Sequence, residues 1–290
     1  MSETVRITVL AENTAEGRGL LAEHGLAFWI EAGSQCILFD TGQGGVLVNN
    51  GYRLGISLSR VDAIVLSHGH YDHTGGLADA LRGNRPTAIY AHPDAMKPKF
   101  AQNKDGTSRE IGMPYLCEQA VERRRGQLVL TEKPTRVSNV LTATGPVPRV
   151  TEFEDTGGPF FLDAQCRTPD PLVDDQAVFF ESTRGTVVLL GCAHAGVINT
   201  LRYVRQRTDN RPIHAVLGGM HLVSASAQRL KWTIHELREM KIDCLGPSHC
   251  TGRAATAALW DALPGQCIPC HVGTQIEFDL FTPSTIGASL

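Results

Sequence analysis

The chain has 290 residues, of which 42% are hydrophobic and 20% charged, so it can bury a sizeable core and global disorder is excluded. Its 27 lysines and arginines nearly balance 30 aspartates and glutamates, and the formal charge of -3 argues against a general nucleic-acid or membrane-surface binder. No apolar run reaches the roughly 18 residues of a membrane span, and the first residues do not resemble a secretory leader. We therefore expect a cytoplasmic protein with neither a nucleic acid nor a membrane as partner.

Short apolar runs separated by glycine fill the first third of the chain and predict strands. Hydrophobic residues alternate with polar ones at 5–9, and apolar runs follow at 27–30 and 36–39. The run at 61–66 becomes continuously apolar toward its end, which predicts a strand buried on both faces. A further strand is predicted at 88–91, after a helix that carries Leu77 and Leu81.

The pattern weakens between residues 97 and 175, a stretch too long for an ordinary connection within a compact domain. We interpret it as an inserted segment that covers or lines a site, within a single domain that spans residues 1–290. The insertion carries several basic residues, among them Lys97, Lys99, Lys104 and Arg109.

Three apolar strands in the last third are each followed by glycine or proline and then by a histidine. The strands are predicted at 187–190, 215–217 and 244–246, and the histidines are His194, His221 and His249. Because α/β proteins place their chemistry at the carboxyl ends of strands, we expect these three imidazoles to face one cleft.

The segment Ser67–Gly76 reads Ser-His-Gly-His-Tyr-Asp-His-Thr-Gly-Gly and directly follows the buried strand. His68 and His70 point to one side of an extended backbone, whereas the adjacent Asp72 and His73 require a turn. Such a turn can direct four side chains at two neighbouring points. Histidine and aspartate are suitable ligands for zinc and other divalent transition metals, so the segment predicts a metal site rather than a polar surface loop.

The pattern His68-x-His70-x-Asp72-His73 resembles the signature of the metallo-β-lactamase superfamily. The resemblance covers nearly the whole chain and narrows to the branch similar to dihydropterin-methyl-ribofuranosylaminobenzene phosphate synthase (DHPS-like). It is carried by the motif itself and by further segments at 24–27, 38–42, 90–93, 145–149, 174–177, 191–199, 218–222 and 247–252. It implies an α+β fold, a four-layer αββα sandwich with the metal site along one edge of two facing sheets.

The resemblance also implies how six side chains divide between two metal ions. His68, His70 and His194 would hold one ion, and Asp72, His73 and His249 the other. The cofactor would be one or two Zn²⁺ ions, with Mn²⁺, Fe²⁺ or Mg²⁺ as alternatives. The commoner superfamily pattern has a bridging aspartate where this chain carries Cys192, so we expect the second ion to bind weakly or to be absent.

Several further residues receive roles at this site. Asp72 and His221 are assigned catalytic roles, with His221 a ligand, a substrate-binding group or a proton donor. Asp40 is expected to orient the ligand loop by hydrogen bonding. Cys192 is either a thiolate ligand or a buried packing thiol beside the metal. Arg149 binds a phosphate or carboxylate of the substrate, or forms a surface salt bridge.

The remaining histidines give no sign of a function, and His235, next to the apolar stripe of its helix, is expected to be solvated. His24, His92, His214 and His271 lie outside any cluster in the sequence, so none of them is assigned a role.

Three functions remain open. The favoured one is hydrolysis of a small ester, lactone, amide or phosphate compound through a metal-bound hydroxide. The DHPS-like resemblance implies an alternative, a transferase that joins a dihydropterin-methyl diphosphate to an arylamine and releases pyrophosphate, aided by Arg149 and the basic residues of the insertion. A non-catalytic metal-containing protein that binds a ligand is the third. The expected partner is a small molecule, which is phosphorylated in some of these functions. An oligomer is compatible with the sequence.

Overall fold

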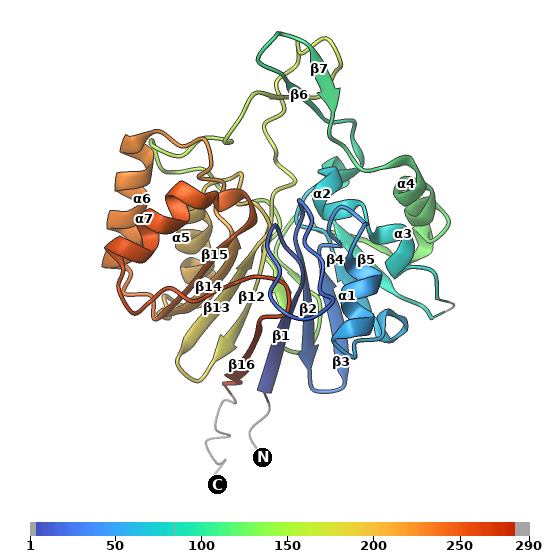
Figure 1. Cartoon of the computed structure of the whole chain (residues 1–290), viewed down its shortest axis with the longest axis horizontal. Helices are drawn as coiled ribbons and strands as arrows, with labels where there is room; N and C mark the ends of the chain where they lie inside the picture. Colours follow the sequence, from blue (N-terminus) through green and yellow to red (C-terminus); the bar gives the residue numbers. More distant parts are fainter. Residues whose placement is uncertain (1–3, 84, 282–290) are drawn as a thin grey trace, which may run out of the picture.

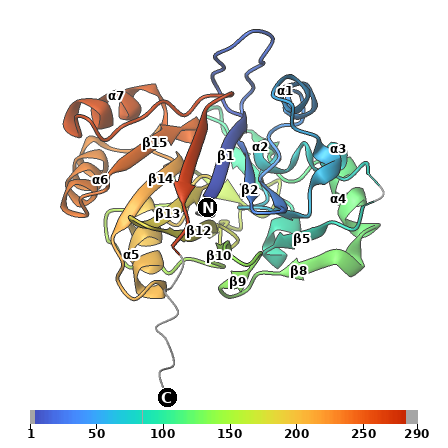
Figure 2. The same ribbon diagram turned by 90° about the horizontal axis from the view of Figure 1, so that it is seen from below.

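The structure, a computed structural model, describes residues 4–83 and 85–281. Two β-sheets face each other, and helices cover the outer face of each (Figure 1). The view from below shows the same order of layers, helix, sheet, sheet and helix (Figure 2). The expected α+β sandwich is therefore confirmed.

The first sheet has seven strands in the order β16-β1-β2-β3-β4-β5-β8. Strands β16 to β3 pair antiparallel, whereas β3, β4, β5 and β8 are parallel. The strands are β1 (Thr4–Ala11), β2 (Ala27–Ala32), β3 (Gln35–Phe39), β4 (Ala63–Val65), β5 (Ala88–Ala91), β8 (Leu128–Leu130) and β16 (Gln275–Asp279). Helices on its outer side are α1 (Leu47–Arg53), α2 (Tyr71–Thr74), α3 (Leu77–Ala80) and α4 (Tyr115–Glu122).

The second sheet has six strands in the order β15-β14-β13-β12-β10-β9. They are β9 (Thr135–Arg136), β10 (Thr142–Ala143), β12 (Ala177–Ser182), β13 (Gly185–Leu190), β14 (Ile213–Gly219) and β15 (Cys244–Ser248). Its outer face packs against α5 (Val197–Arg207), α6 (Ala227–Glu239) and α7 (Arg253–Ala262). Short 3₁₀ turns are η1 (Leu58–Arg60), η2 (Pro93–Met96), η3 (Arg125–Gln127) and η4 (His249–Thr251).

The strands are buried on both faces because each sheet contacts its partner sheet on one side and helices on the other. In β2, Phe28 and Ile30 enter the core between the sheets, and Ala27 and Trp29 enter the core beneath the helices. This division follows from the two-residue period of side chains along a strand. It explains why these segments are almost continuously apolar in the sequence.

Parallel strands bring the site together. Strands β13, β14 and β15 run in the same direction, so their carboxyl ends meet at one edge of the sheet. The loop after β4 reaches the corresponding edge of the first sheet, at the top of Figure 1. The four loops that carry the predicted site residues therefore lie together at one end of the sandwich.

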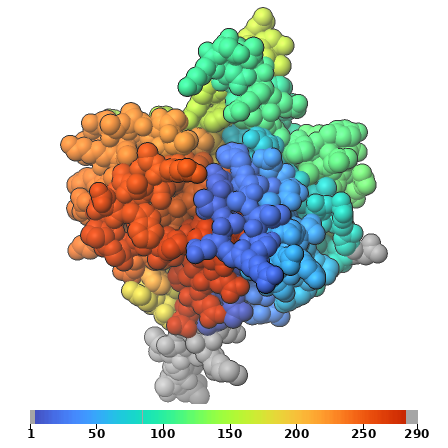
Figure 3. Space-filling model, in the orientation of Figure 1, coloured from blue at the N-terminus to red at the C-terminus, as the bar shows by residue number. Residues whose placement is uncertain are grey.

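The segment at 97–175, expected as one insertion, is divided among three places. Helix α4 and strand β8 belong to the layers of the first sheet, and β9 and β10 extend the second. A separate three-stranded sheet, here called the cap sheet, consists of β6 (Phe100–Gln102), β7 (Ser108–Glu110) and β11 (Phe160–Phe161). It projects beyond the ligand-bearing edge (Figures 1 and 3).

Within the described residues, no helix has both the length and the apolar character needed to cross a membrane.

Candidate metal centre

The structure brings all six predicted ligand side chains together. The ring centres of His68 and His194 lie 4.8 Å apart, and those of His70 and His194 lie 5.0 Å apart. His73 and His249 are likewise 5.0 Å apart between ring centres. We call His68, His70 and His194 the first ligand group, and Asp72, His73 and His249 the second ligand group.

The loop that carries the motif follows a path that requires glycine. A Cβ atom on Gly69 would lie 2.3 Å from the carbonyl oxygen of Ala95 and 2.8 Å from Cε of Lys99. Any side chain there would push the loop away from the 95–99 segment. Helix α2 then begins at Tyr71, and this turn separates Asp72 and His73 from the first two histidines.

Four of the histidines have the Nδ1 atom occupied by a hydrogen bond. His68 bonds Ser67 Oγ (2.9 Å), His73 bonds Asp40 Oδ2 (2.7 Å), His194 bonds the carbonyl oxygen of Thr156 (2.7 Å) and His249 bonds Asn13 Oδ1 (2.9 Å). The hydroxyl of Ser67 itself donates to Asp40, so the His68 Nδ1–H must be the donor in its pair. Each contact fixes the ring and leaves Nε2 as the nitrogen that can bind a cation, an arrangement typical of metal-binding histidines.

The first ligand group consists of neutral imidazoles. Burial, followed by the proximity of other imidazoles, lowers the pKa values of His68 and His194 well below the ordinary value, and burial does the same for His70. Nε2 of His68 lies 2.9 Å from Nδ1 of His70. Nε2 of His194 is buried and has no hydrogen-bond partner within the described residues. Unprotonated, unpaired nitrogens of this kind are what a divalent cation needs.

The second ligand group carries charge. Nε2 of His73 lies 3.2 Å from Nε2 of His249, and Oδ2 of Asp72 lies 3.4 Å from the latter nitrogen. Burial opposes protonation of His73, but Asp40 and Asp72 together outweigh it and raise the pKa of this imidazole. Burial also opposes ionisation of Asp72, yet His73 and hydrogen bonds from His24 and His249 lower the pKa of its carboxyl well below the ordinary value. Two facing nitrogens and a nearby carboxylate can share a proton, and a divalent cation can bind in the place of that proton.

Asp40 connects the two ligand groups. Its carboxylate accepts hydrogen bonds from the backbone N–H (2.7 Å) and the hydroxyl (2.6 Å) of Ser67, and from His73. The side chain is fully buried, and the backbone has a φ of 59°, in the left-handed region. The structure thus places Asp40 where it orients His73 directly and His68 through Ser67.

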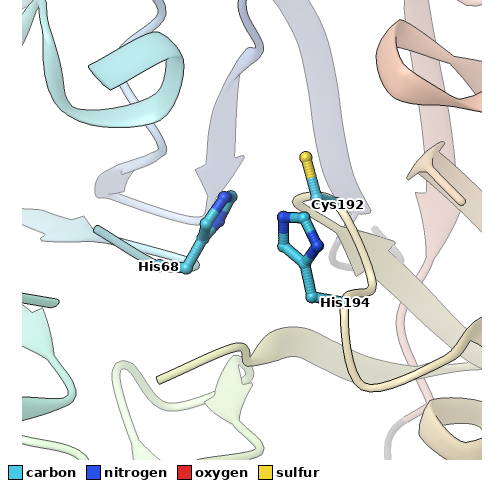
Figure 4. A group of neighbouring side chains, drawn as sticks. All are labelled: His68, Cys192 and His194. Atoms are coloured by element: carbon cyan, nitrogen blue, oxygen red, sulfur yellow. The ribbon is translucent and has the colours of Figure 1, made fainter. Parts of the chain in front are cut away.

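Cys192 lies between the two ligand groups. Its Sγ is 3.1 Å from Nε2 of His73 and lies within 4.8 Å of ligand atoms of His68, His194 and His249. Figure 4 shows the side chains of Cys192, His68 and His194 gathered around one space. Burial raises the pKa of the Cys192 thiol well above its ordinary value, so the group is a neutral thiol when no cation is near.

The loop before β11 and β11 itself lie against the first ligand group. The Phe160 ring centre is 5.2 Å from that of His70 and 5.3 Å from that of His194. The imidazole of His221 lies 4.3 Å from that of His194, between ring centres. A Cβ atom on Gly157 would fall 1.9 Å from Cδ2 of His221, so this glycine is in direct contact with the ring.

A buried ion-pair cluster holds the motif loop beneath the cap sheet. Nζ of Lys99 donates to Asp170 (2.9 Å) and Asp174 (3.0 Å), and its side chain is only 1% exposed. Asp174 also accepts a hydrogen bond from the backbone N–H of Gly69 (2.8 Å). Lys99, expected among the basic groups of the insertion that bind a diphosphate, is therefore not free to do so, because two carboxylates neutralise it.

The guanidinium of Arg149 faces the backbone of the ligand loops. It donates to the carbonyl oxygens of His194 and Pro171, both at 2.8 Å. These bonds hold the loop after β13, and a substrate-binding role for Arg149 stays a prediction.

The expectation that His24 lies outside any cluster is wrong, because its imidazole lies beside the second ligand group. Its Nε2 is 3.0 Å from Oδ2 of Asp72, and its ring centre is 5.0 Å from that of His249. The loop between β1 and β2 brings it there.

The same β1–β2 loop supplies two further residues that the sequence did not reveal. Oε1 of Glu12 accepts a hydrogen bond from the backbone N–H of His249 (2.7 Å), and Asn13 bonds the ring of the same histidine. Both lie more than 230 positions from His249 in the chain, and neither belongs to a recognisable motif.

Comparisons with known proteins find relatives that match most of the chain. A family model described as the metallo-beta-lactamase superfamily matches residues 21–249. The chain is 33% identical over 255 residues to an uncharacterized protein of Methanocaldococcus jannaschii, covering 87% of this chain and 93% of the relative. It is 28% identical over 291 residues to the 7,8-dihydropterin-6-methyl-4-(beta-D-ribofuranosyl)-aminobenzene-5'-phosphate synthase of the same organism, covering 95% and 97%.

Among solved structures, a metal-dependent hydrolase of the beta-lactamase superfamily matches with a TM-score of 0.79 and 26% identity, covering 95% of this chain and 99% of that one. The family model spans most of the chain, and the ligand-bearing loops meet at the edge of a four-layer sandwich. The chain therefore belongs to the metallo-beta-lactamase superfamily.

Proposed function

We propose that this protein is a metal-dependent enzyme that hydrolyses a small ester, lactone, amide or phosphate compound, with zinc as the cation. The observation that carries the proposal is the convergence of six ligand side chains whose ligand atoms face one another. Four of them are histidines with Nδ1 already bonded, so that Nε2 is the nitrogen directed at the other ligand side chains or left unpartnered.

The side chains fit zinc. His68, His70 and His194 would hold one ion, and Asp72, His73 and His249 a second, which are imidazole and carboxylate sets of the kind zinc prefers. The buried and unpartnered Nε2 of His194 supports this fit, since an orphaned polar atom in a dry interior is costly. When bound, a divalent cation supplies Lewis-acid activation of water and of the bond to be broken.

The chain's own residues would supply orientation and proton transfer. Asp40 holds the imidazole of His73, and Thr156 holds that of His194. His221, beside His194 and beneath Gly157, has a buried Nδ1 with no hydrogen-bond partner within the described residues. We assign it the transfer of a proton at Nδ1 to the departing group. Phe160 shields this side of the site from water.

A second candidate function, the pterin-type transferase, is favoured by one observation, the nearly full-length similarity to the Methanocaldococcus synthase. It needs cationic groups for a diphosphate. Lys99 is buried between two carboxylates, and Arg149 donates to two backbone carbonyls. Because these two cations are already engaged, hydrolysis is the function that we favour.

The two functions differ in their co-substrate, water or an arylamine, and in whether the reaction releases pyrophosphate. We expect the zinc-loaded protein to turn over at least one class in a panel of esters, lactones, amides and phosphate compounds with water as the only co-substrate. The parallel assay supplies a dihydropterin-methyl diphosphate with an arylamine. Pyrophosphate release that depends on the arylamine, with no turnover of the panel, would replace the hydrolase by the transferase. A zinc-loaded protein inactive in both assays would indicate a ligand-binding protein.

A further inference from the structure

The thiol of Cys192 is shared by three candidate metal-binding sets, two of which contain predicted metal ligands and the third of which joins it to His221 and Cys250. Of the two sets with predicted ligands, one joins it to His68 and His194, and the other joins it to His73 and His249. In each set, the ligand atoms all lie within 4.8 Å of one another. Cys192 lies two residues after the end of β13 and is buried, with 3% of its surface exposed. Its sulfur therefore belongs to both ligand groups by position.

The separations between these atoms are slightly shorter than those of donors around a bound metal. With Zn–N bonds of about 2.0–2.1 Å and a Zn–S bond of about 2.3 Å, neighbouring donors in a tetrahedral site lie about 3.3–3.6 Å apart. Nε2 of His73 lies 3.2 Å from Nε2 of His249 and 3.1 Å from Sγ of Cys192. These three atoms form a compact set that would hold an ion after moving apart by a few tenths of an ångström.

A simple packing role explains the surroundings of Cys192 poorly. A thiol carries one proton and can donate to one acceptor, yet this sulfur is surrounded by the ligand nitrogens of four histidines. A packing cysteine is normally surrounded by apolar groups, as Cys36 is in the core beneath the helices of the first sheet. A thiol placed among the ligand nitrogens of four histidines is better suited to a shared cation.

We infer that Cys192 is a metal ligand and that its thiolate bridges the two ligand groups. The S–H bond breaks when the cation binds, the proton passes to solvent, and a sulfur–metal bond forms without any electron transfer. The inference rests on the proposed function only in that both require a cation at this edge. A thiolate bridge would favour zinc, cobalt or cadmium over magnesium or manganese, because soft donors select against hard cations.

Cys250 provides the internal control. It is buried, with 7% of its surface exposed, and its thiol lies 3.7 Å from the carbonyl oxygen of Cys192. It clusters with Cys192 and His221, but it is absent from the two sets that contain the predicted ligands. Replacing it therefore removes a neighbouring thiol without removing the bridge. Cys36 serves as a control for loss of a distant buried thiol.

The test is a titration of the metal-free protein with Co²⁺, followed by absorption. Visible bands report cobalt binding, and a near-ultraviolet thiolate-to-cobalt band reports a Co–S bond. We expect the thiolate band to rise over two equivalents in the native protein and in the Cys250→Ser and Cys36→Ser variants. It should be lost in Cys192→Ser and Cys192→Asp, and Cys192→Asp should still bind two equivalents because a carboxylate can bridge. Circular dichroism checks that every variant is folded.

Each of the other outcomes contradicts one stated part of the inference or of the proposed function. A thiolate band that persists in Cys192→Asp overturns the inference, and a band lost only in Cys250→Ser assigns the thiolate to Cys250 instead. A band complete after one equivalent restricts the sulfur to one ligand group and refutes the bridge. Cobalt binding without any thiolate band overturns the inference and leaves the proposed metalloenzyme intact, whereas absence of cobalt binding removes both.

Discussion

The two ligand groups lie side by side but are held by different kinds of partner. In the first, the hydroxyl of Ser67 and the carbonyl oxygen of Thr156 orient His68 and His194, and burial lowers the pKa values of all three histidines. In the second, Asp72 is itself charged, and the carboxylate of Asp40 raises the pKa of His73. The first group thus offers neutral nitrogens, and the second offers negative charge that attracts the ion. Substitutions should therefore affect the two groups unequally.

Removing a ligand should have the largest effect. We expect His68→Ala to lose the ion of the first group and His249→Ala to lose that of the second, and each to reduce activity by more than the roughly 10–100-fold caused by loss of a supporting residue. Elemental analysis of each variant, with steady-state rates on the substrate found in the panel, measures both. Retention of full metal content and activity would refute the ligand assignment. His235→Ala, on α6, is the matched control and should change neither.

Breaking the ion-pair cluster beneath the first group should have the largest effect on stability. Lys99→Met leaves Asp170 and Asp174 as uncompensated buried charges, which costs about 3–5 kcal/mol of unfolding free energy. Burial lowers the pKa of Lys99, but the two carboxylates outweigh it and raise the value above 10.5. The stabilisation is therefore fully present below about pH 10.5 and is lost as the pH rises through the folded-state pKa.

Urea unfolding of the native protein and Lys99→Met at neutral pH measures this cost, and the native protein repeated above pH 10.5 tests the direction of the pH effect. An exposed lysine, Lys231→Met, is the control. A difference below about 1 kcal/mol at neutral pH would show that the cluster does not hold the loop.

Removing the charge that connects the groups should have an intermediate effect. Asp40→Asn keeps the shape of the side chain but weakens its bonds to Ser67 and His73. We expect metal affinity to fall about 10–100-fold, with the larger loss in the second group, which Asp40 contacts directly. Competition with a chelator measures both affinities. Asp62→Asn, remote from the site, should behave as the native protein does, and an equal loss in both groups would contradict the asymmetry.

The smallest effect should be confined to the second group. Asn13→Ala removes the acceptor for Nδ1 of His249, so we expect its ion to bind about 10-fold more weakly while the first ion is unaffected. Asn13→Asp keeps an acceptor and should restore most of the affinity. A loss in the first group, measured in the same chelator competition, would mean that the two groups are not separable in this way.

The sequence indicated which histidines and aspartate converge better than it indicated which residues orient them. The motif at 67–76 and the histidines after three strands were visible because parallel strands must end at one edge, whatever the details of packing. The four-layer arrangement came from the resemblance. By contrast, Asn13, Glu12 and His24 lie in an irregular loop, where single polar residues carry no periodic signal.

The segment at 97–175 was hardest to interpret for a related reason. Strands β9, β10 and β11 are each two residues long, too short for an alternation to be seen. The partners of Lys99 lie more than 70 positions away, so nothing local distinguishes this buried lysine from the exposed basic residues near it.

Thr156 and Gly157 are neighbours in one short loop. The carbonyl oxygen of Thr156 orients His194, and Gly157 contacts the ring of His221. Exchanging this loop would alter both the contact with His221 and the hydrogen bond that orients the imidazole of His194. On the proposed function, substrate selectivity and metal binding therefore depend on the same loop, and loop grafts intended to change one should be screened for the other.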